Sequence, residues 1–191
     1  RSGLEFMGES TQAMQRDDLQ NPAMLNVADG EAVWQRKLGL TGKSCADCHG
    51  DAAKSMRGMA ARYPAYEPVG ARPINLAQRI NVCIERHQGA TPLRFESPDL
   101  LNLEAFVALQ SRGMPIESSD ERLRPFIEQG RSLFTARQGQ INLSCAQCHD
   151  DNWGRKLAGI PVPQAHPTGY PLYRLEWQSL GSLQRRLRNC M

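Results

Sequence analysis

Four of the six cysteines lie in two copies of one motif, Cys-x-x-Cys-His. The copies are CADCH, which ends at His49, and CAQCH, which ends at His149. This motif is the attachment sequence of c-type haem. Two thiols three positions apart on a helical turn can reach two vinyl groups on one porphyrin edge, and the adjoining histidine can turn its ring to the iron. We therefore predict two covalently bound haem c groups, attached through Cys45, Cys48, Cys145 and Cys148 and ligated through His49 and His149.

Zinc sites and thioredoxin-like redox motifs also use Cys-x-x-Cys pairs. A zinc site would join both pairs at one metal, but the pairs lie 100 residues apart and each carries its own histidine. A thioredoxin-like motif needs a βαβ context that this sequence lacks. The motifs also indicate a compartment, because bacterial thioether attachment of haem takes place outside the cytoplasmic membrane. Resemblance to c-type cytochromes therefore implies a periplasmic protein.

The composition argues against some classes of partner, but by itself it indicates no function. The 191 residues carry a net charge of +3 with acids and bases interspersed, which gives no electrostatic case for binding nucleic acid or a membrane surface. The sequence has no run of about 18 apolar residues that would span a bilayer. It opens at Arg1 without a positively charged leader, so we expect a processed product from which any export signal has been removed. Aromatic residues make up 6% of the chain, so a buried prosthetic group would help to fill two small cores.

Both haem motifs stand in copies of a longer module. GEAVWQRKLGLTGKSCADCHGD begins at Gly30, and GRSLFTARQGQINLSCAQCHDD begins at Gly130. The glycine, both cysteines, the histidine and a later aspartate have equal offsets in the two segments. Each segment has the apolar spacing of an amphipathic helix before its motif. We therefore predict a duplicated module in which a helix leads into each haem motif.

A second match in each module ends in one of the two remaining cysteines. LAQRINVC ends at Cys83, and LQRRLRNC ends at Cys190. Leucine, arginine and an aliphatic residue precede each cysteine by seven, four and three positions, which share one helical face with it. These residues are Leu76, Arg79 and Ile80 in the first copy and Leu183, Arg186 and Leu187 in the second. We expect each cysteine to project from a short helix beside its own haem.

The second axial ligand of a haem iron decides between electron transfer, gas binding and catalysis. Methionine is the usual second axial ligand in electron carriers, and the candidates in this chain are Met56, Met59, Met114 and Met191. The histidine alternatives are His87 and His166. A disulfide between Cys83 and Cys190 is a further alternative, because two remaining cysteines usually pair in an oxidising compartment. Their matching places in the two copies favour one thiolate per haem, so we predict Cys83 and Cys190 as iron ligands.

Three arginines, Arg185, Arg186 and Arg188, precede Cys190 closely. Arg186 lies one helical turn before the cysteine, where its charge would attract an anion to the thiol. The alternative is that the arginines form a solvated helix face, as charge runs usually do. This alternative has more weight for Arg185 and Arg188 than for Arg186, which shares the face of the cysteine.

The elements between the motifs predict an all-α protein with long loops. LLNLEAFVALQSR has the apolar period of a terminal packing helix, as small cytochrome c domains require. The polar stretch RGMPIESSDERLRP reads as a linker, and TQAMQRDDLQNP as a helix that stops before Pro22. We therefore expect an N-terminal extension over 1–29, a first haem domain over 30–114 and a second haem domain over 115–191.

GSLQRRLRNCM, the two haem motifs, RINVC and the N-terminal SGLEFM, TQAMQ and NPAM together resemble the SoxA family. The resemblance implies two tandem class I cytochrome c-like domains, each haem ligated by histidine and cysteine, and a heterodimer with the monohaem cytochrome c SoxX. It implies an L-cysteine S-thiosulfotransferase that joins thiosulfate to a cysteine of the SoxYZ carrier protein. It also assigns catalytic roles to Cys190, as a cysteine persulfide, and to Arg186. Relatives continue past this cysteine, so the second domain is expected to be truncated at Met191.

Two other functions fit part of the pattern. A thiosulfate dehydrogenase also combines two such haem motifs with a cysteine ligand, but it makes tetrathionate from two thiosulfates and needs no carrier protein. A plain dihaem electron carrier would leave Cys83 and Cys190 joined by a disulfide. The duplicated placement of the two cysteines and the LRNC ending favour the transferase.

Overall fold

The computed structural model describes residues 2–190, which form two compact units. The larger unit contains residues 22–121 and 169–190, and the smaller unit contains residues 2–21 and 122–168. These boundaries differ from the three consecutive segments expected from the sequence, because residues 169–190 belong to the larger unit. No helix in the described range is both long and apolar enough to cross a bilayer.

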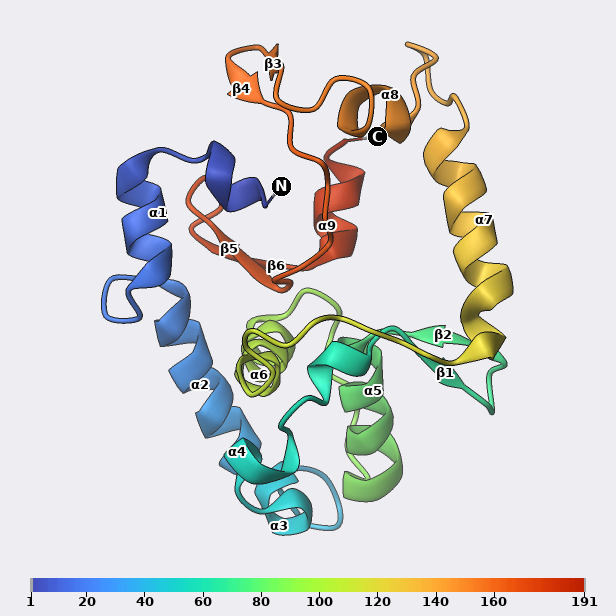
Figure 1. Ribbon diagram of the computed structural model, residues 1–191. Coiled ribbons are helices and arrows are strands. Elements are labelled where there is room, and N and C mark those ends of the chain that lie inside the picture. The colour runs from blue at the N-terminus through green and yellow to red at the C-terminus, as the bar shows by residue number, and fades with distance from the viewer. Residues whose placement is uncertain (1, 191) are drawn as a thin grey trace. The chain divides into compact units, whose positions relative to one another are not determined.

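The larger unit contains most of the regular structure (Figure 1). Its helices are α2 (Ala23–Gln35), α3 (Cys45–His49), α4 (Ala52–Ser55), the 3-10 turn η2 (Ala60–Arg62), α5 (Leu76–Cys83), the π-helical turn η3 (Ile84–Gln88), α6 (Pro98–Leu109) and α9 (Leu183–Arg188). Its strands are β1 (Ala65–Glu67), β2 (Arg72–Ile74), β5 (Leu172–Arg174) and β6 (Ser179–Gly181). The predicted terminal packing helix is confirmed as α6, which begins after the N-cap Ser97 with Pro98 in its first turn.

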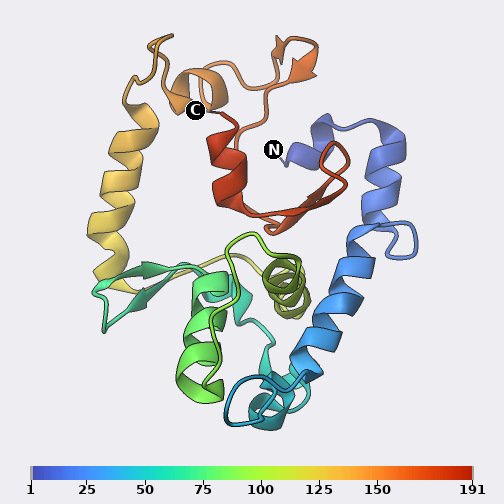
Figure 2. The same ribbon diagram turned by 180° about the vertical axis from the view of Figure 1, so that it is seen from behind.

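The core of the larger unit lies where α2 packs against α6, as both ribbon views show (Figures 1 and 2). Val33 and Trp34 of α2 meet Leu103, Phe106 and Val107 of α6 in one buried cluster. The Trp34 and Phe106 rings lie 5.9 Å apart. Burial of this apolar surface, at about 25 cal/mol per Å², holds the two helices together and fixes the end of α2 beside the first haem motif.

A second apolar cluster attaches residues 169–190 to the larger unit. Leu101 and Ala105 of α6 form this cluster with Leu180 of β6, and Tyr173 of β5 packs against it. Every residue of α6 from Leu100 to Val107 is therefore buried. A helix that is buried all round needs partners on several sides, and the β5–β6 hairpin is one of them.

The structure repeats one hairpin and helix at an offset of 107 residues. Strand β1 pairs with β2 in antiparallel register, with Ala65 opposite Ile74, and β5 pairs with β6, with Leu172 opposite Gly181. Each hairpin follows a cis Tyr-Pro peptide and leads into a capped helix, α5 or α9. The sequence match before each cysteine therefore extends to a structural repeat of 63–83 by 170–190.

The smaller unit contains the second haem motif. Its elements are the 3-10 turn η1 (Gly3–Phe6), α1 (Glu9–Arg16), α7 (Arg124–Thr135), α8 (Cys145–His149), β3 (Lys156–Leu157) and β4 (Ile160–Pro161), with the turn η4 (Glu121–Leu123) before α7. The helices expected before both haem motifs are thus present as α2 and α7. The helix expected before Pro22 is present as α1, whereas α2 begins at Ala23 and so includes the end of the predicted extension.

The fold is helix-rich with few short strands, which agrees with the predicted helical class. In residues 2–190 three two-stranded antiparallel hairpins, β1–β2, β3–β4 and β5–β6, lie between the helices. Each strand has two or three residues, which is too short for alternation of apolar and polar residues to appear in the sequence. Each hairpin therefore depends on its turn and on packing rather than on a recognisable strand pattern.

Candidate haem sites

The first haem motif forms the short helix α3, whose start is fixed by a capping box. The Ser44 hydroxyl accepts the Asp47 backbone N–H at 3.0 Å, and the Asp47 carboxylate accepts the Ser44 backbone N–H at 2.8 Å. This reciprocal pair satisfies two backbone donors that the helix itself leaves without partners. The capping box therefore sets Cys45, Cys48 and His49 on one turn of helix.

Trp34 connects this turn to the core. Its indole N–H donates to the Gly50 carbonyl at 3.3 Å, and its ring lies 5.8 Å from the His49 ring. Because Trp34 is buried between α2 and α6, it gives His49 a rigid neighbour on one side. A histidine held at the end of a haem motif in this way suits a proximal ligand.

The structure gathers three thiols in the larger unit: Cys45, Cys48 and Cys83. Burial raises the pKa of Cys83, the charges of Arg79 and Arg86 oppose that rise, and Cys48 adds to it. Burial also raises the pKa of Cys45, opposed by a hydrogen bond from the Gln88 amide, whose Nε2 lies 3.7 Å from Cys45 Sγ. Two attachment thiols with a third, half-buried thiol beside them form a donor set that fits one covalently bound haem with a sulfur ligand.

The second haem motif repeats the local geometry of the first in the smaller unit. At the start of α8, Gln147 N–H donates to the Ser144 hydroxyl at 3.3 Å and Ser144 N–H donates to Gln147 Oε1 at 2.9 Å. His149 Nδ1 lies 2.7 Å from the Pro163 carbonyl oxygen. A carbonyl can only accept, so Nδ1 carries the proton and Nε2 keeps its lone pair for a metal. Cys145, Cys148 and His149 thus fit a second haem.

Of the two predicted catalytic residues, Arg186 lies in α9 and Cys190 lies in the turn that follows it, two residues past the last helical residue, Arg188. Ser182 caps it by accepting the Arg185 N–H at 3.1 Å, and the Cys190 N–H donates to the Leu187 carbonyl at 3.0 Å. Arg186 is half-buried and Cys190 is exposed. The Cys190 thiol is therefore at the surface of the described chain, just beyond the end of α9.

The three arginines before Cys190 have different surroundings. The Arg185 guanidinium lies 4.0 Å from the centre of the Trp177 ring, and that of Arg188 lies 5.3 Å from the centre of the Phe95 ring. These are cation–π contacts, made while Arg188 is exposed and the Arg185 side chain is 40% exposed, so both side chains also remain in contact with solvent. Arg186 instead interacts electrostatically with Tyr170. Burial raises the pKa of the Tyr170 hydroxyl, and the positive charge of Arg186 opposes that rise.

Tyr170 lies outside the sequence motifs, but the position of its first-module counterpart, Tyr63, points to it. Tyr63 precedes Arg79 by 16 residues, as Tyr170 precedes Arg186. Burial raises the pKa of Tyr63, while the charge and hydrogen bond of Arg79 oppose the rise. Both modules therefore combine a tyrosine, an arginine and a cysteine. The difference is access, because Cys83 is half-buried and Cys190 is exposed.

The predicted residues divide between the two units. His49 and Cys83 lie in the larger unit, whereas His149 lies in the smaller unit and Cys190 in the larger. Ligation of one iron by His149 and Cys190 therefore stays a prediction. In residues 2–190 no disulfide joins Cys83 and Cys190.

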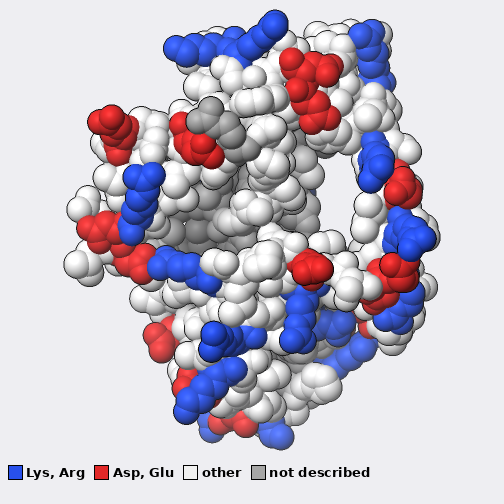
Figure 3. Space-filling model, viewed as in Figure 1, with Lys and Arg blue, Asp and Glu red and all other residues white. Residues whose placement is uncertain are grey.

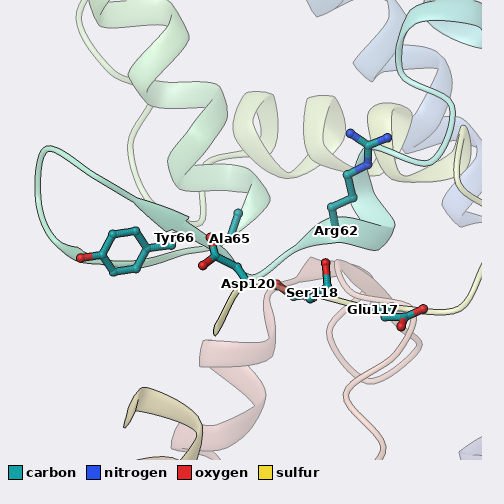
Figure 4. Close-up of a pocket in the computed structure, with 7 residues that line it drawn as sticks. Arg62, Ala65, Tyr66, Glu117, Ser118 and Asp120 are labelled. Carbon is teal, nitrogen blue, oxygen red and sulfur yellow. The ribbon is translucent and has the colours of Figure 1, made fainter. Parts of the chain in front are cut away.

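The surface also has a pocket that lies outside the predicted haem sites. An open pocket of about 610 Å³ is lined by Arg62, Ala65, Tyr66 and residues 117–120 (Figure 4). The Arg62 guanidinium is directed away from Asp120 in this view, and the lining includes no predicted site residue. Lys and Arg side chains are interspersed with Asp and Glu on the face drawn in Figure 3.

Comparisons with known proteins agree with the motifs. The sequence profile of the family described as SoxA/TsdA, cytochrome c domain, matches residues 29–116, which implies covalently bound haem c. SoxA subunits of L-cysteine S-thiosulfotransferase from Pseudaminobacter salicylatoxidans and Rhodovulum sulfidophilum are each 36% identical over 192 residues, covering 100% of this chain and 67% of theirs. The crystal structure of SoxXA from P. pantotrophus matches with a TM-score of 0.93 and 32% identity, over 99% of this chain and 72% of that one. This chain belongs to the SoxA family, whose curated members are subunits of L-cysteine S-thiosulfotransferases.

Proposed function

We propose that this chain conjugates thiosulfate to a cysteine of the SoxYZ carrier protein and passes the released electrons to the haem of SoxX. Its curated relatives are named as subunits of this class of transferase, and its structural match is a SoxXA complex, which supports a SoxX partner. The proposal includes two haem c groups, His49 with Cys83 as ligands of the first and His149 with Cys190 as ligands of the second. It also places the protein in the periplasm.

The proposal depends most on one contrast between the two modules. Arg79 precedes Cys83 by four residues, as Arg186 precedes Cys190, but Cys83 is the last residue of α5 whereas Cys190 lies two residues past the end of α9. The Cys83 thiol is half-buried and the Cys190 thiol is exposed. Ligation of a haem iron can use either thiol. Reaction with a dissolved anion and then with a second protein needs the exposed one.

The conjugation of thiosulfate to the carrier is an oxidation. A carrier thiol and thiosulfate form a sulfur–sulfur bond, and one proton and two electrons leave. Haem irons, when bound, would accept these electrons one at a time. Arg186 has the charge and the planar donors that bind the sulfonate oxygens of thiosulfate and hold its outer sulfur toward Cys190.

Cys190 provides the sulfur to which the substrate is attached. A bond forms between the sulfur carried by Cys190, as the thiolate or as a persulfide, and the outer sulfur of thiosulfate, as two electrons are lost. The thiolate of the carrier then attacks the attached sulfane sulfur, and the sulfur of Cys190 leaves as an anion. Covalent attachment divides one difficult step into two easier ones.

Matched cysteine variants test this function. We expect Cys190→Ala to abolish conjugation of thiosulfate to SoxYZ by the complex with SoxX, measured as the mass increase of the carrier. Cys83→Ala, at the equivalent position, should retain conjugation. Full turnover by the Cys190→Ala variant would reject the proposal, and formation of tetrathionate without carrier would favour the thiosulfate dehydrogenase instead.

A further inference from the structure

The N-terminus of α9 is held by a carboxylate from a distant part of the chain. The Ser182 backbone N–H donates to Glu96 Oε1 at 3.0 Å, across 86 residues of sequence. Ser182 is 8% exposed, so this N–H is largely shielded from water. A buried N–H without a partner costs about as much as a lost hydrogen bond. The bond to Glu96 therefore matters for the start of this helix.

Three other α-helices in residues 2–190, and the 3-10 turn η1, satisfy the backbone N–H of their N-cap residue locally. At the start of α5, Asn75 N–H donates to Gln78 Oε1 at 2.9 Å and Gln78 N–H donates to Asn75 Oδ1 at 2.8 Å. The helices α3 and α8 have equivalent boxes, each completed by the side chain at the third helical position. That side chain is always one that can accept a hydrogen bond.

In α9 the third helical position is Arg185, the counterpart of Gln78. A guanidinium has five N–H donors and no acceptor, so Arg185 cannot complete the box. The Glu96 carboxylate takes that place. The capping box of α9 is therefore built from two distant segments, whereas that of α5 is built from one.

The same carboxylate also holds the side chain of Arg185. Glu96 Oε2 lies 3.8 Å from Arg185 Nη1, is buried and accepts no hydrogen bond from the described residues. The Arg185 charge is thus its close partner there, while the guanidinium also stacks on Trp177 at 4.0 Å. The preceding residue, Phe95, receives Arg188 over its ring. Residues 95–96 therefore contact α9 near both of its ends.

We propose that Glu96 is a positioning residue for the Arg186–Cys190 pair. Helix α9 has six residues, and so short a helix depends on its cap and its packing rather than on its own propensity. Fixing the first turn at Ser182 and Arg185 fixes the direction of the next residue, Arg186, and of the chain to Cys190. The assignment of a reactive role to this pair rests on the proposed function, but the positioning itself does not.

Hydrogen exchange in the haem-loaded complex with SoxX tests the positioning. We expect Glu96→Ala to increase exchange of the α9 amides about tenfold, as for loss of one hydrogen bond, while the α5 amides stay unchanged. Glu96→Gln keeps an acceptor for the Ser182 N–H and should have a smaller effect. Glu31→Ala, which removes an exposed carboxylate of α2, is the matched control and should change neither helix.

The decisive variant combines Glu96→Ala with Arg185→Gln. We expect Glu96→Ala alone to lower conjugation of thiosulfate as well as to speed exchange in α9. The second change supplies an acceptor at the third helical position, as in α5, and should restore slow exchange in α9 and most of that conjugation. Unchanged α9 exchange in Glu96→Ala, or no recovery in the double variant, would overturn the positioning role. A wild-type complex that fails to conjugate thiosulfate would overturn the proposed function, and the exchange result would still decide the role of Glu96.

Discussion

Gly30 of α2 lies directly against the backbone of Asn102 in α6. A Cβ at position 30 would fall 2.0 Å from the Asn102 carbonyl oxygen and 2.8 Å from the Cβ of Phe106. The glycine therefore sets how closely the two core helices approach. For its counterpart in the second module, Gly130 of α7, such a Cβ would meet no atom of the described chain within 4 Å apart from neighbouring residues and the backbone of its own helix.

Replacing these two glycines should have opposite effects. We expect Gly30→Ala to lower the free energy of unfolding by about 1–3 kcal/mol or more, because the added methyl group meets backbone that cannot move aside. Gly130→Ala should raise it by up to about 1 kcal/mol, because alanine favours an exposed helix over glycine. Urea unfolding of the haem-loaded protein measures both. Equal effects of the two changes would contradict the packing described for α2 and α6.

Glu104 should make stability depend on pH. Burial raises its pKa from 4.5 to about 7, although the Ala77 backbone N–H opposes the rise and Glu96 adds to it. Between these two pH values the folded protein holds a proton that the unfolded chain has lost. The contribution of Glu104 to stability therefore falls as pH rises from 4.5 to about 7, and it stays low above that range.

Glu104→Gln should remove this dependence. The free energy of unfolding of the variant minus that of wild type is expected to increase across the same interval by up to about 3 kcal/mol. Urea titrations at several pH values measure the difference, with Glu31→Gln on the exposed face of α2 as the control. A constant difference between variant and wild type at all pH values would show that Glu104 is not buried as described.

Arginine replacements distinguish the two modules. Arg186→Lys keeps a positive charge but loses the planar pair of donors, so conjugation of thiosulfate should fall by about 10-fold to 100-fold. Arg79→Lys makes the same change beside the half-buried Cys83 and should leave conjugation near the wild-type rate. Steady-state assays over a range of thiosulfate concentrations measure both. Equal losses in the two variants would show that access to Cys190 does not decide which module reacts.

Much of the site could be predicted from the sequence because its chemistry depends on local spacing. The haem motifs form helices α3 and α8 because serine and a side-chain acceptor lie three residues apart at the start of each. The match before Cys83 and Cys190 predicted helices α5 and α9, and α6 has the expected apolar pattern. Residues within one turn of each other carry such signals.

The remaining features depend on contacts between distant residues. Leu180 reaches the α6 core across 75 or more residues, so the assignment of 169–190 to the larger unit has no local pattern. Glu96 is one of many carboxylates in the sequence, and nothing nearby marks it as the partner of Ser182. Tyr170 could have been found, because the 107-residue offset that relates Cys83 to Cys190 also relates Tyr63 to Tyr170.

The most direct test of sulfur ligation in both modules is low-temperature EPR spectroscopy of the oxidised, haem-loaded protein. Two low-spin ferric signals with the compressed g-tensor of a thiolate ligand are predicted, of which one is lost in Cys83→Met and the other in Cys190→Met. A wild-type spectrum without thiolate signals, or one that neither change alters, would contradict ligation by Cys83 and Cys190.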